Sequence, residues 1–213
     1  MDEMCLEMCK IIRWERGYRL ILDRVDFSVH KKEKVLIRGK IQEDTRQMFQ
    51  VASGVTAVQE GTYRISRAGI IPEQFPDLER MRAIDYLLLP LLTQGYSRKQ
   101  AWGRIKPMVK TSTLWEKRMI YADNLTAYEK GVLLSIAALS TEPEILLAGD
   151  GISKMTEEER KKYGTWISGR LADSGMAFAA FGNLWEDILC FDRICEIQNG
   201  HLLEIHNTRE EKG

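Results

Sequence analysis

The stretch that most constrains the fold is residues 35–55, which read VLIRGKIQEDTRQMFQVASGV. A short apolar run leads into a polar loop opening at Gly39, and a segment with helical pattern follows. Strand, loop and helix in this order form the geometry of a phosphate-binding loop, in which backbone N–H groups at a helix N-terminus face an anion. The chemistry usual for such a loop is missing. Residues 40–46 contain no glycine, no lysine directly ahead of a serine or threonine, and two adjacent carboxylates, Glu43 and Asp44.

The rest of the chain alternates between strand-like and helical patterns. Residues 8–14 and 20–29 predict an N-terminal antiparallel hairpin around the turn at 15–17. Residues 75–141 have helical spacing of apolar positions, with Ser97 as an expected N-cap. The later elements expected are buried strands at 145–148 and 176–181, a charged amphipathic helix at 157–171, and a closing hairpin of 194–197 and 202–205 around Asn199 and Gly200.

This alternation predicts an α/β fold with a mostly parallel central sheet, an N-terminal antiparallel β subdomain and a helical lid insertion. We expect one domain over 1–213, with its core in 1–74 and 142–213 and the lid at about 75–141. The polar end, 208–213, is expected to fray.

The amino-acid composition limits the classes of function that the chain could have. Lys plus Arg and Asp plus Glu number 31 each, so no overall charge attracts nucleic acid or anionic lipid. The apolar runs are shorter than the roughly 20 residues that cross a bilayer, and residues 1–10 lack a secretory core, so we expect a cytoplasmic protein. The four cysteines, and the isolated His30, His201 and His206, lack metal-ligand spacing, so no metal site is expected.

Five segments in order carry a family resemblance. They are 22–29 leading into 33–37, the turn QEGTYRI at 59–65, residues 73–92, TEPEILL at 141–147, and FDRI with NGHL at 191–194 and 199–202. Together they resemble the nucleotide-binding domain of ABC transporters over nearly the whole chain. Within 73–92, Glu73-Gln74-Phe75, 82–86 and 89–92 are similar to the subfamily serving lipoprotein-release, macrolide-export and cell-division permeases. The resemblance implies a P-loop NTPase-like fold.

The departures from this family fall on its ATP positions. With Gly39 as the first Walker A glycine, the next two glycine positions are Gln42 and Asp44. The phosphate-binding lysine position is Thr45, and the magnesium-binding serine position is Arg46. A side chain at the glycine positions should distort the phosphate cradle. One carboxylate about 4 Å from one phosphate charge costs roughly 4 kcal/mol at an effective dielectric near 20, or about three decades of affinity. Arg46 or Lys40 would offset part of this cost.

The other motif positions differ as well. By the same resemblance, the Walker B aspartate position is Gly149, the catalytic glutamate position is Asp150, and the switch histidine position is Gly182. Asp150 is the residual catalytic candidate; alternatively it only caps the following turn. Glu73 holds the Q-loop glutamine position, with Gln74 as a slipped alternative. The signature segment reads Leu125, Thr126, Ala127, Tyr128 and Glu129, and the D-loop aspartate position is Thr156.

Because an ABC dimer builds each ATP site from one subunit's Walker A and the other's signature, loss of both halves implies a pseudo-ATPase. No cofactor is expected, and binding of ATP with Mg²⁺ should be weak. The family implies a membrane permease or another ABC subunit as partner, in a homo- or heterodimer, and a peripheral position at the inner face of the plasma membrane. The permease groove would include Glu73, Gln74, Phe75, Tyr86, Leu89 and Pro90, which alternatively form only lid core.

Three further interpretations stay open. Trp14 resembles the family's adenine-stacking aromatic, with Tyr18 as a competitor, but either residue could instead cover the hairpin. A slow ATPase that uses Arg46 and Asp150 is the enzymatic alternative. A soluble homodimeric regulator or scaffold without a permease is the other. We interpret Trp102, Trp115, Trp166 and Trp185 as core or interface anchors.

Overall fold

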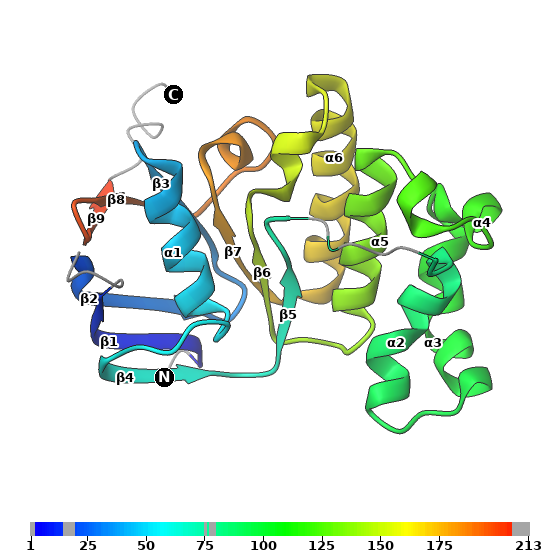
Figure 1. The fold of residues 1–213 in the computed structure, drawn as a ribbon, viewed down its shortest axis with the longest axis horizontal. Coiled ribbons are helices and arrows are strands. Elements are labelled where there is room, and N and C mark those ends of the chain that lie inside the picture. The colour runs from blue at the N-terminus through cyan, green and yellow to red at the C-terminus, as the bar shows by residue number, and fades with distance from the viewer. Residues whose placement is uncertain (1–2, 15–19, 75, 77–79, 206–213) are drawn as a thin grey trace.

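The computed structural model describes residues 3–14, 20–74, 76 and 80–205 (Figure 1). Two sheets and the helices around them make up this part of the chain. The elements are β1 (Met4–Trp14), β2 (Leu20–His30), β3 (Lys34–Gly39), α1 (Gln42–Ala52), β4 (Glu60–Ile65), β5 (Ala68–Ile71), α2 (Ala83–Thr93), α3 (Arg98–Lys110), α4 (Leu114–Lys117), η1 (Ala122–Asn124), α5 (Ala127–Leu139), β6 (Ile145–Ala148), η2 (Asp150–Lys154), α6 (Glu157–Ser174), β7 (Ala177–Phe181), η3 (Asn183–Asp187), β8 (Arg193–Gln198) and β9 (His201–Ile205).

The central sheet has the order β5-β6-β7-β3-β8-β9. Its first five strands are parallel, and β9 returns antiparallel to β8 through the turn at Asn199 and Gly200. The carboxyl ends of parallel strands meet at one edge of a sheet. This topology therefore gathers the residues that follow β3, β5, β6 and β7.

The three inner strands β3, β6 and β7 are buried on both faces, which explains their continuous apolar sequences. Leu36, Leu146 and Phe178 pack toward α5, α6 and the helical insertion. Val35 and Leu147 pack toward α1 and the second sheet. Figure 1 shows α1 on one side of the central sheet and α5 and α6 on the other. The sheet thus separates two apolar cores.

The second sheet, β2-β1-β4, is antiparallel throughout and covers α1 from the side away from the central sheet. Its inward residues, such as Leu6, Met8 and Leu22, alternate with more exposed ones, as expected for a sheet with one buried face. The predicted N-terminal antiparallel subdomain is confirmed. The predicted turn at 15–17 lies outside the described residues, as do 206–213.

The helical insertion follows β5 and precedes β6. In α3 the predicted N-cap is present: Ser97 accepts from the backbone N–H of Gln100, whose side chain accepts from the backbone of Ser97. Trp102 and Trp115 stack with ring centroids 6.2 Å apart and join α3 to α4. The predicted fold class is confirmed. Within the described ranges, no helix is both long and apolar enough to cross a membrane.

Candidate functional site

The connection between β3 and α1 is much shorter than the sequence suggested. β3 ends at Gly39 and α1 begins at Gln42, so only Lys40 and Ile41 lie between them. The expectation of a polar loop over residues 40–46 is wrong from Gln42 onward. Glu43 and Asp44 are good residues for a first helical turn, because their charge complements the partial positive charge of the helix N-terminus. The helix therefore starts where a phosphate-binding loop would need open backbone.

The first turn of α1 is surrounded by side chains that belong to α1 itself. The Arg46 guanidinium contacts the Glu43 carboxylate through two hydrogen bonds of 2.7 and 2.5 Å. Gln47 donates to the same carboxylate at 2.7 Å. Asp44 and Thr45 are buried, and the Thr45 hydroxyl donates to the Gln42 carbonyl at 2.8 Å. Arg46, the expected rescue cation for a phosphate, is paired within the protein.

The end of β6 is packed against the end of β5. A Cβ built on Gly149 would lie 2.4 Å from Glu73 Cγ and 2.7 Å from its backbone nitrogen, distances that no real Cβ tolerates. Burial raises the pKa of Glu73 to about 7; Arg46 opposes this shift, and the carboxylates of Glu43 and Asp150 add to it. Glu73 therefore occupies the space that a side chain at position 149 would need.

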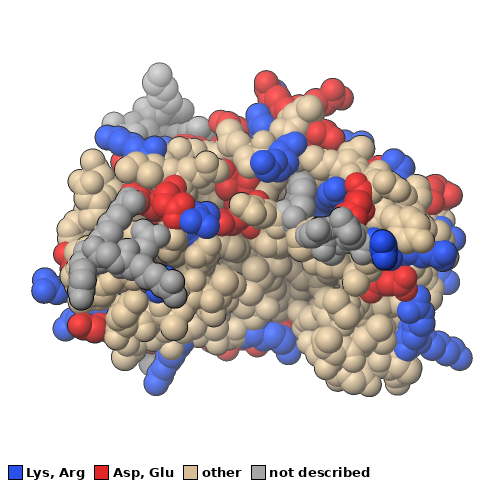
Figure 2. Space-filling view, in the orientation of Figure 1, with Lys and Arg blue, Asp and Glu red and all other residues tan. Residues whose placement is uncertain are grey.

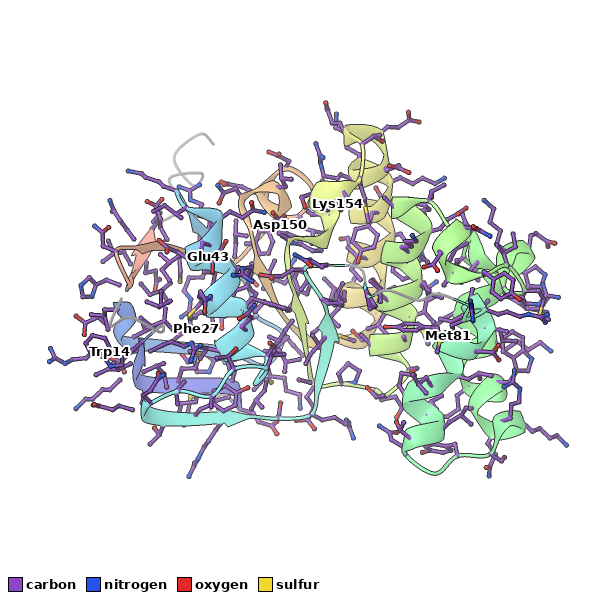
Figure 3. The ribbon with its side chains drawn as sticks, in the orientation of Figure 1. Trp14, Phe27, Glu43, Met81, Asp150 and Lys154 are labelled. Carbon is purple, nitrogen blue, oxygen red and sulfur yellow. The ribbon has the colours of Figure 1, made fainter. Side chains whose placement is uncertain are left out.

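Asp150 follows Gly149 and is packed in a similar way. Its Oδ2 accepts a hydrogen bond from Gln42 Nε2 at 3.2 Å, whereas Oδ1 is buried without a hydrogen-bond partner among the described residues. Burial raises the pKa of Asp150 to about 6, against the opposing effects of Gln42 and Arg160. Gly182, at φ +131°, lies against it, since an added Cβ would be 2.8 Å from Asp150 Cγ. In Figure 3, Glu43 and Asp150 lie near the same edge of the central sheet.

Asn183 and Trp185, in the segment that follows β7, connect the strand ends at this edge of the sheet through hydrogen bonds. The Asn183 amide donates to the Gly39 carbonyl and accepts from the Gly39 N–H, both at 3.1 Å. The indole of the fully buried Trp185 donates to the Gly149 carbonyl at 3.1 Å. Sequence reasoning interpreted Trp185 as a core or interface anchor and missed Asn183. A polar amide two residues after a buried strand was the signal for it.

The structure thus brings together Gly39, Gln42, Asp44, Thr45, Arg46, Glu73, Gly149, Asp150 and Gly182 at the carboxyl edge of the sheet. The signature-like residues form a separate group at the start of α5, which lies across the central sheet from α1 (Figure 1). Thr126 caps α5 and forms a capping box with Glu129. The Glu129 carboxylate is buried and forms an ion pair with Lys117, with 2.5 Å between Oε1 and Nζ. Leu125 and Tyr128 are buried, and Lys162 lies over the Tyr128 ring.

The remaining candidates lie elsewhere. Trp14, at the end of β1, is 40% exposed and lies at the outer edge of the molecule, well away from Asp150 (Figure 3). Of the expected groove residues, Tyr86 packs partly into the lid core, Leu89 is 43% exposed and Pro90 is partly exposed within α2. Phe75 lies outside the described residues. Thr156, in the D-loop position, is the N-cap of α6.

Within the described part of the chain, no group of three His, Cys, Asp or Glu side chains could hold a metal ion. Cys5 and Cys195 are buried, Cys9 is partly buried and Cys190 is exposed.

The fold is that of an ABC ATPase cassette, with its antiparallel β subdomain, mixed central sheet and surrounding helices. A nucleotide-free ATP-binding cassette from an ABC transporter superposes with a TM-score of 0.79 at 16% identity, covering 94% of this chain and 90% of that one. The dimeric structure of a bacterial ABC transporter cassette gives 0.79 at 14% identity, covering 95% of this chain and 99% of that one.

The comparison with proteins related in sequence is narrower than the comparison with solved structures. The chain is 22% identical over 209 residues to the methionine import ATP-binding protein MetN of Clostridioides difficile, covering 89% of this chain. It is 25% identical over 203 residues to MetN of Nocardia farcinica, covering 92%. It spans 65% and 60% of the length of these two relatives. No protein-family model matches the chain.

Proposed function

We propose that this chain is an ATP-binding-protein-like subunit of a membrane ABC complex that has lost hydrolysis and acts as a binding or regulatory subunit. The observation that carries the proposal is the two-residue connection between β3 and α1, where the helix begins at Gln42 and supplies its own carboxylates. The residues present do not fit a triphosphate with Mg²⁺. The space of a cradle is taken by a helical turn, and a phosphate there would face Glu43.

Charge and packing support the same conclusion at the neighbouring strand ends. A Mg²⁺-orienting carboxylate at position 149 is excluded by the contact of Gly149 with Glu73. A larger residue at position 182 is disfavoured by the φ of +131° and by Asp150, whose Cγ would lie 2.8 Å from the added Cβ. We infer that the loss of catalysis involves several positions that now pack against one another.

A slow ATPase is the second candidate, and one observation favours it. Asp150 has a pKa raised to about 6 and one carboxylate oxygen without a hydrogen-bond partner, which are properties of a general base near neutral pH. Against it, that oxygen is buried, and Arg46 is already bonded to Glu43.

Binding and turnover of ATP with Mg²⁺ test the two candidates together. We expect no saturable binding in the micromolar range by calorimetry, and phosphate release no faster than without protein. Micromolar binding with turnover that Asp150→Asn abolishes would establish the slow ATPase and reject the pseudo-ATPase.

The partner is a separate part of the proposal. The relatives are named as import ATP-binding proteins, and the lid residues Leu89 and Pro90 remain accessible for contact. We propose that the chain binds a membrane permease or another ABC subunit through the groove of Glu73, Gln74, Phe75, Tyr86, Leu89 and Pro90, at the inner face of the plasma membrane. The similarity to the lipoprotein-release subfamily also stays a proposal.

Co-purification from native membranes tests the groove, with Leu89→Asp as the disrupting variant. The control is Leu203→Asp, which changes another exposed leucine, on β9. Retention of a multi-span protein by the wild type and the control alone supports the groove. A homodimer that carries no membrane protein would support the soluble regulator instead.

A further inference from the structure

Helix α3 carries an unusual distribution of charge. Its 13 residues include five cations and no carboxylate, although the whole chain has equal numbers of cationic and acidic residues. Two of the cations are arginines with partners: Arg98 pairs with Asp85 and Arg104 with Glu142, both at 2.6 Å. The other three are lysines, Lys99, Lys106 and Lys110, and none of them forms an ion pair within the described residues.

The three lysines share one face of the helix. At 3.6 residues per turn, positions 99, 106 and 110 fall within an arc of about 40°. All three are exposed, on the side of α3 away from the buried Ala101, Ile105 and Val109. The next exposed position on this side is Gly103, beside which there is open space. Figure 2 shows Lys and Arg side chains along the outer edge of the molecule where α3 lies in Figure 1. We call Lys99, Lys106 and Lys110 the lysine face.

Helix stability accounts for only one member of the lysine face, Lys110, which lies in the last turn, where the helix dipole favours a cation. Lys99 lies in the first turn, where the helix dipole disfavours cations. Lys106 and Lys110 are spaced i,i+4, an arrangement that destabilises a helix when the charges are alike. The same chain arranges another exposed helix differently: in α6, Lys161 pairs with Glu157 at 2.5 Å. The exposed surface of α6 thus carries charges of both signs, whereas the lysine face of α3 carries cations alone.

Aromatic side chains border the lysine face. Trp102 is half-buried beside it and stacks on Trp115. The ammonium of Lys110 lies 5.5 Å from the centre of the Trp115 ring. The guanidinium of Arg118, at the C-terminal end of α4, lies 4.4 Å from the same ring centre. Half-buried indoles beside flexible lysines are typical of surfaces that meet lipid headgroups. The lysine face is also the ridge of a helix rather than a groove, which suits a broad anionic surface better than an acidic peptide.

We propose that the lysine face binds anionic phospholipid headgroups and so orients the helical insertion against a membrane surface. Three lysines give only modest affinity, and each contributes roughly fivefold near an anionic bilayer. The attraction decreases within a Debye length of about 8 Å at physiological ionic strength, so salt should weaken it strongly. The lysine face belongs to α3, which packs against α2, the helix that carries Leu89 and Pro90 of the expected permease groove. Its three lysines are not among the residues of that groove or of the carboxyl edge of the sheet, and the proposed binding requires neither nucleotide nor permease.

Vesicle co-sedimentation of the full chain tests the proposal. The vesicles contain either phosphatidylcholine alone or equal parts phosphatidylcholine and phosphatidylglycerol. The test variant combines Lys99→Gln, Lys106→Gln and Lys110→Gln. The matched control combines Lys154→Gln, Lys161→Gln and Lys162→Gln, which makes the same change in net charge at exposed lysines outside α3. Thermal unfolding of both variants checks that they fold.

We expect the wild type and the control to bind the anionic vesicles and not the neutral ones, with binding lost at high salt. The test variant should bind on the order of 100-fold more weakly, from three factors of about five. Equal weakening in both variants would show a general charge effect and overturn the proposal. Absence of vesicle binding, or lysine-dependent binding to duplex DNA or polyglutamate in its place, would overturn it as well. None of these outcomes depends on ATP hydrolysis, so the proposed loss of catalysis stands or fails separately.

Discussion

At the scale of residues, two carboxyl groups dominate the carboxyl edge of the central sheet. Glu73 and Asp150 are both partly buried; burial raises the pKa of each, and the carboxylate of Asp150 adds to the shift of Glu73. In a working nucleotide site, bound cations would offset such repulsion. Here Arg46 is the cation that lowers the pKa of Glu73, and it is itself bonded to Glu43. The edge therefore carries a protonation equilibrium close to neutral pH.

This equilibrium predicts a pH-dependent stability. The pKa of Glu73 rises from 4.5 to about 7 on folding, so the folded protein binds more protons than the unfolded chain between these values. The free energy of unfolding should therefore fall as the pH rises from about 4.5 to about 7. Glu73→Gln should remove a share of this fall, on the order of 1 to 2 kcal/mol after solvent screening is discounted. Urea unfolding at several pH values measures it.

The control for this titration is Glu116→Gln, which changes an exposed carboxylate on α4. Its curve of unfolding free energy against pH should run parallel to the wild-type curve. If the curve of Glu73→Gln were also parallel, the carboxyl group of Glu73 would not be the source of the slope.

A second residue-scale prediction concerns Gly149. Gly149→Asp restores the residue type that the family resemblance expects, but its Cβ would lie 2.4 Å from Glu73 Cγ. We expect destabilisation by about 2 kcal/mol or more, because overpacked sites must displace backbone or leave rotamer minima. The control, Gly169→Ala in α6, meets no atom within 4 Å and should stabilise by about 0.5 to 1 kcal/mol. A fully stable Gly149→Asp protein would mean that Glu73 moves aside readily.

At the scale of elements, carboxylates of the protein itself lie at both helix N-termini that the resemblance assigns to phosphate binding. α1 has Glu43 and Asp44 in its first turn, without a side-chain cap, and α5 begins with the reciprocal capping box of Thr126 and Glu129. A carboxylate at a helix N-terminus interacts favourably with the same dipole that would attract a phosphate. These two helices thus gain stability from residues that oppose anion binding.

The capping box of α5 gives the element-scale prediction. Thr126→Ala should destabilise the protein by about 1 kcal/mol, because the Glu129 N–H loses its side-chain acceptor. Thr126→Ser should retain most of the stability, since serine caps equally well. Thr165→Ala, at an exposed position within α6, is the control and should change little. Equal losses for the serine and alanine variants would point to the threonine methyl group instead of the cap; thermal unfolding distinguishes them.

The elements also show what sequence could and could not predict. The buried strands and the N-cap at Ser97 were predictable because apolar runs and capping residues act locally. The start of α1 at Gln42 was missed, because the family resemblance placed a loop over residues 40–46, although Glu43 and Asp44 suit the first turn of a helix. The contacts of Glu73 with Gly149 and of Asn183 with Gly39 were equally hidden, since they join segments far apart in the sequence.

At the scale of the whole molecule, the strand ends form one packed unit. Glu73 fills the space beside Gly149, Asp150 fills that beside Gly182, and Asn183 ties β7 to Gly39. Neighbouring residues that share contacts do not respond independently to substitution. Restoring one motif should therefore leave the others in their present arrangement, and under the proposed function such a variant should show no ATP hydrolysis.

Rebuilding the β3–α1 connection tests this whole-molecule prediction. The variant combines Gln42→Gly, Asp44→Gly, Thr45→Lys and Arg46→Ser. It should lose about 2 kcal/mol of stability, because two glycines enter the first turn of α1 and two buried side chains are replaced. Phosphate release from ATP with Mg²⁺ should stay at background, since Gly149, Gly182 and Tyr128 are unchanged. The single variant Arg46→Ser controls for loss of the Glu43 pair. Turnover gained by the rebuilt connection alone would place the whole defect in those four residues, because the remaining positions would then suffice for catalysis.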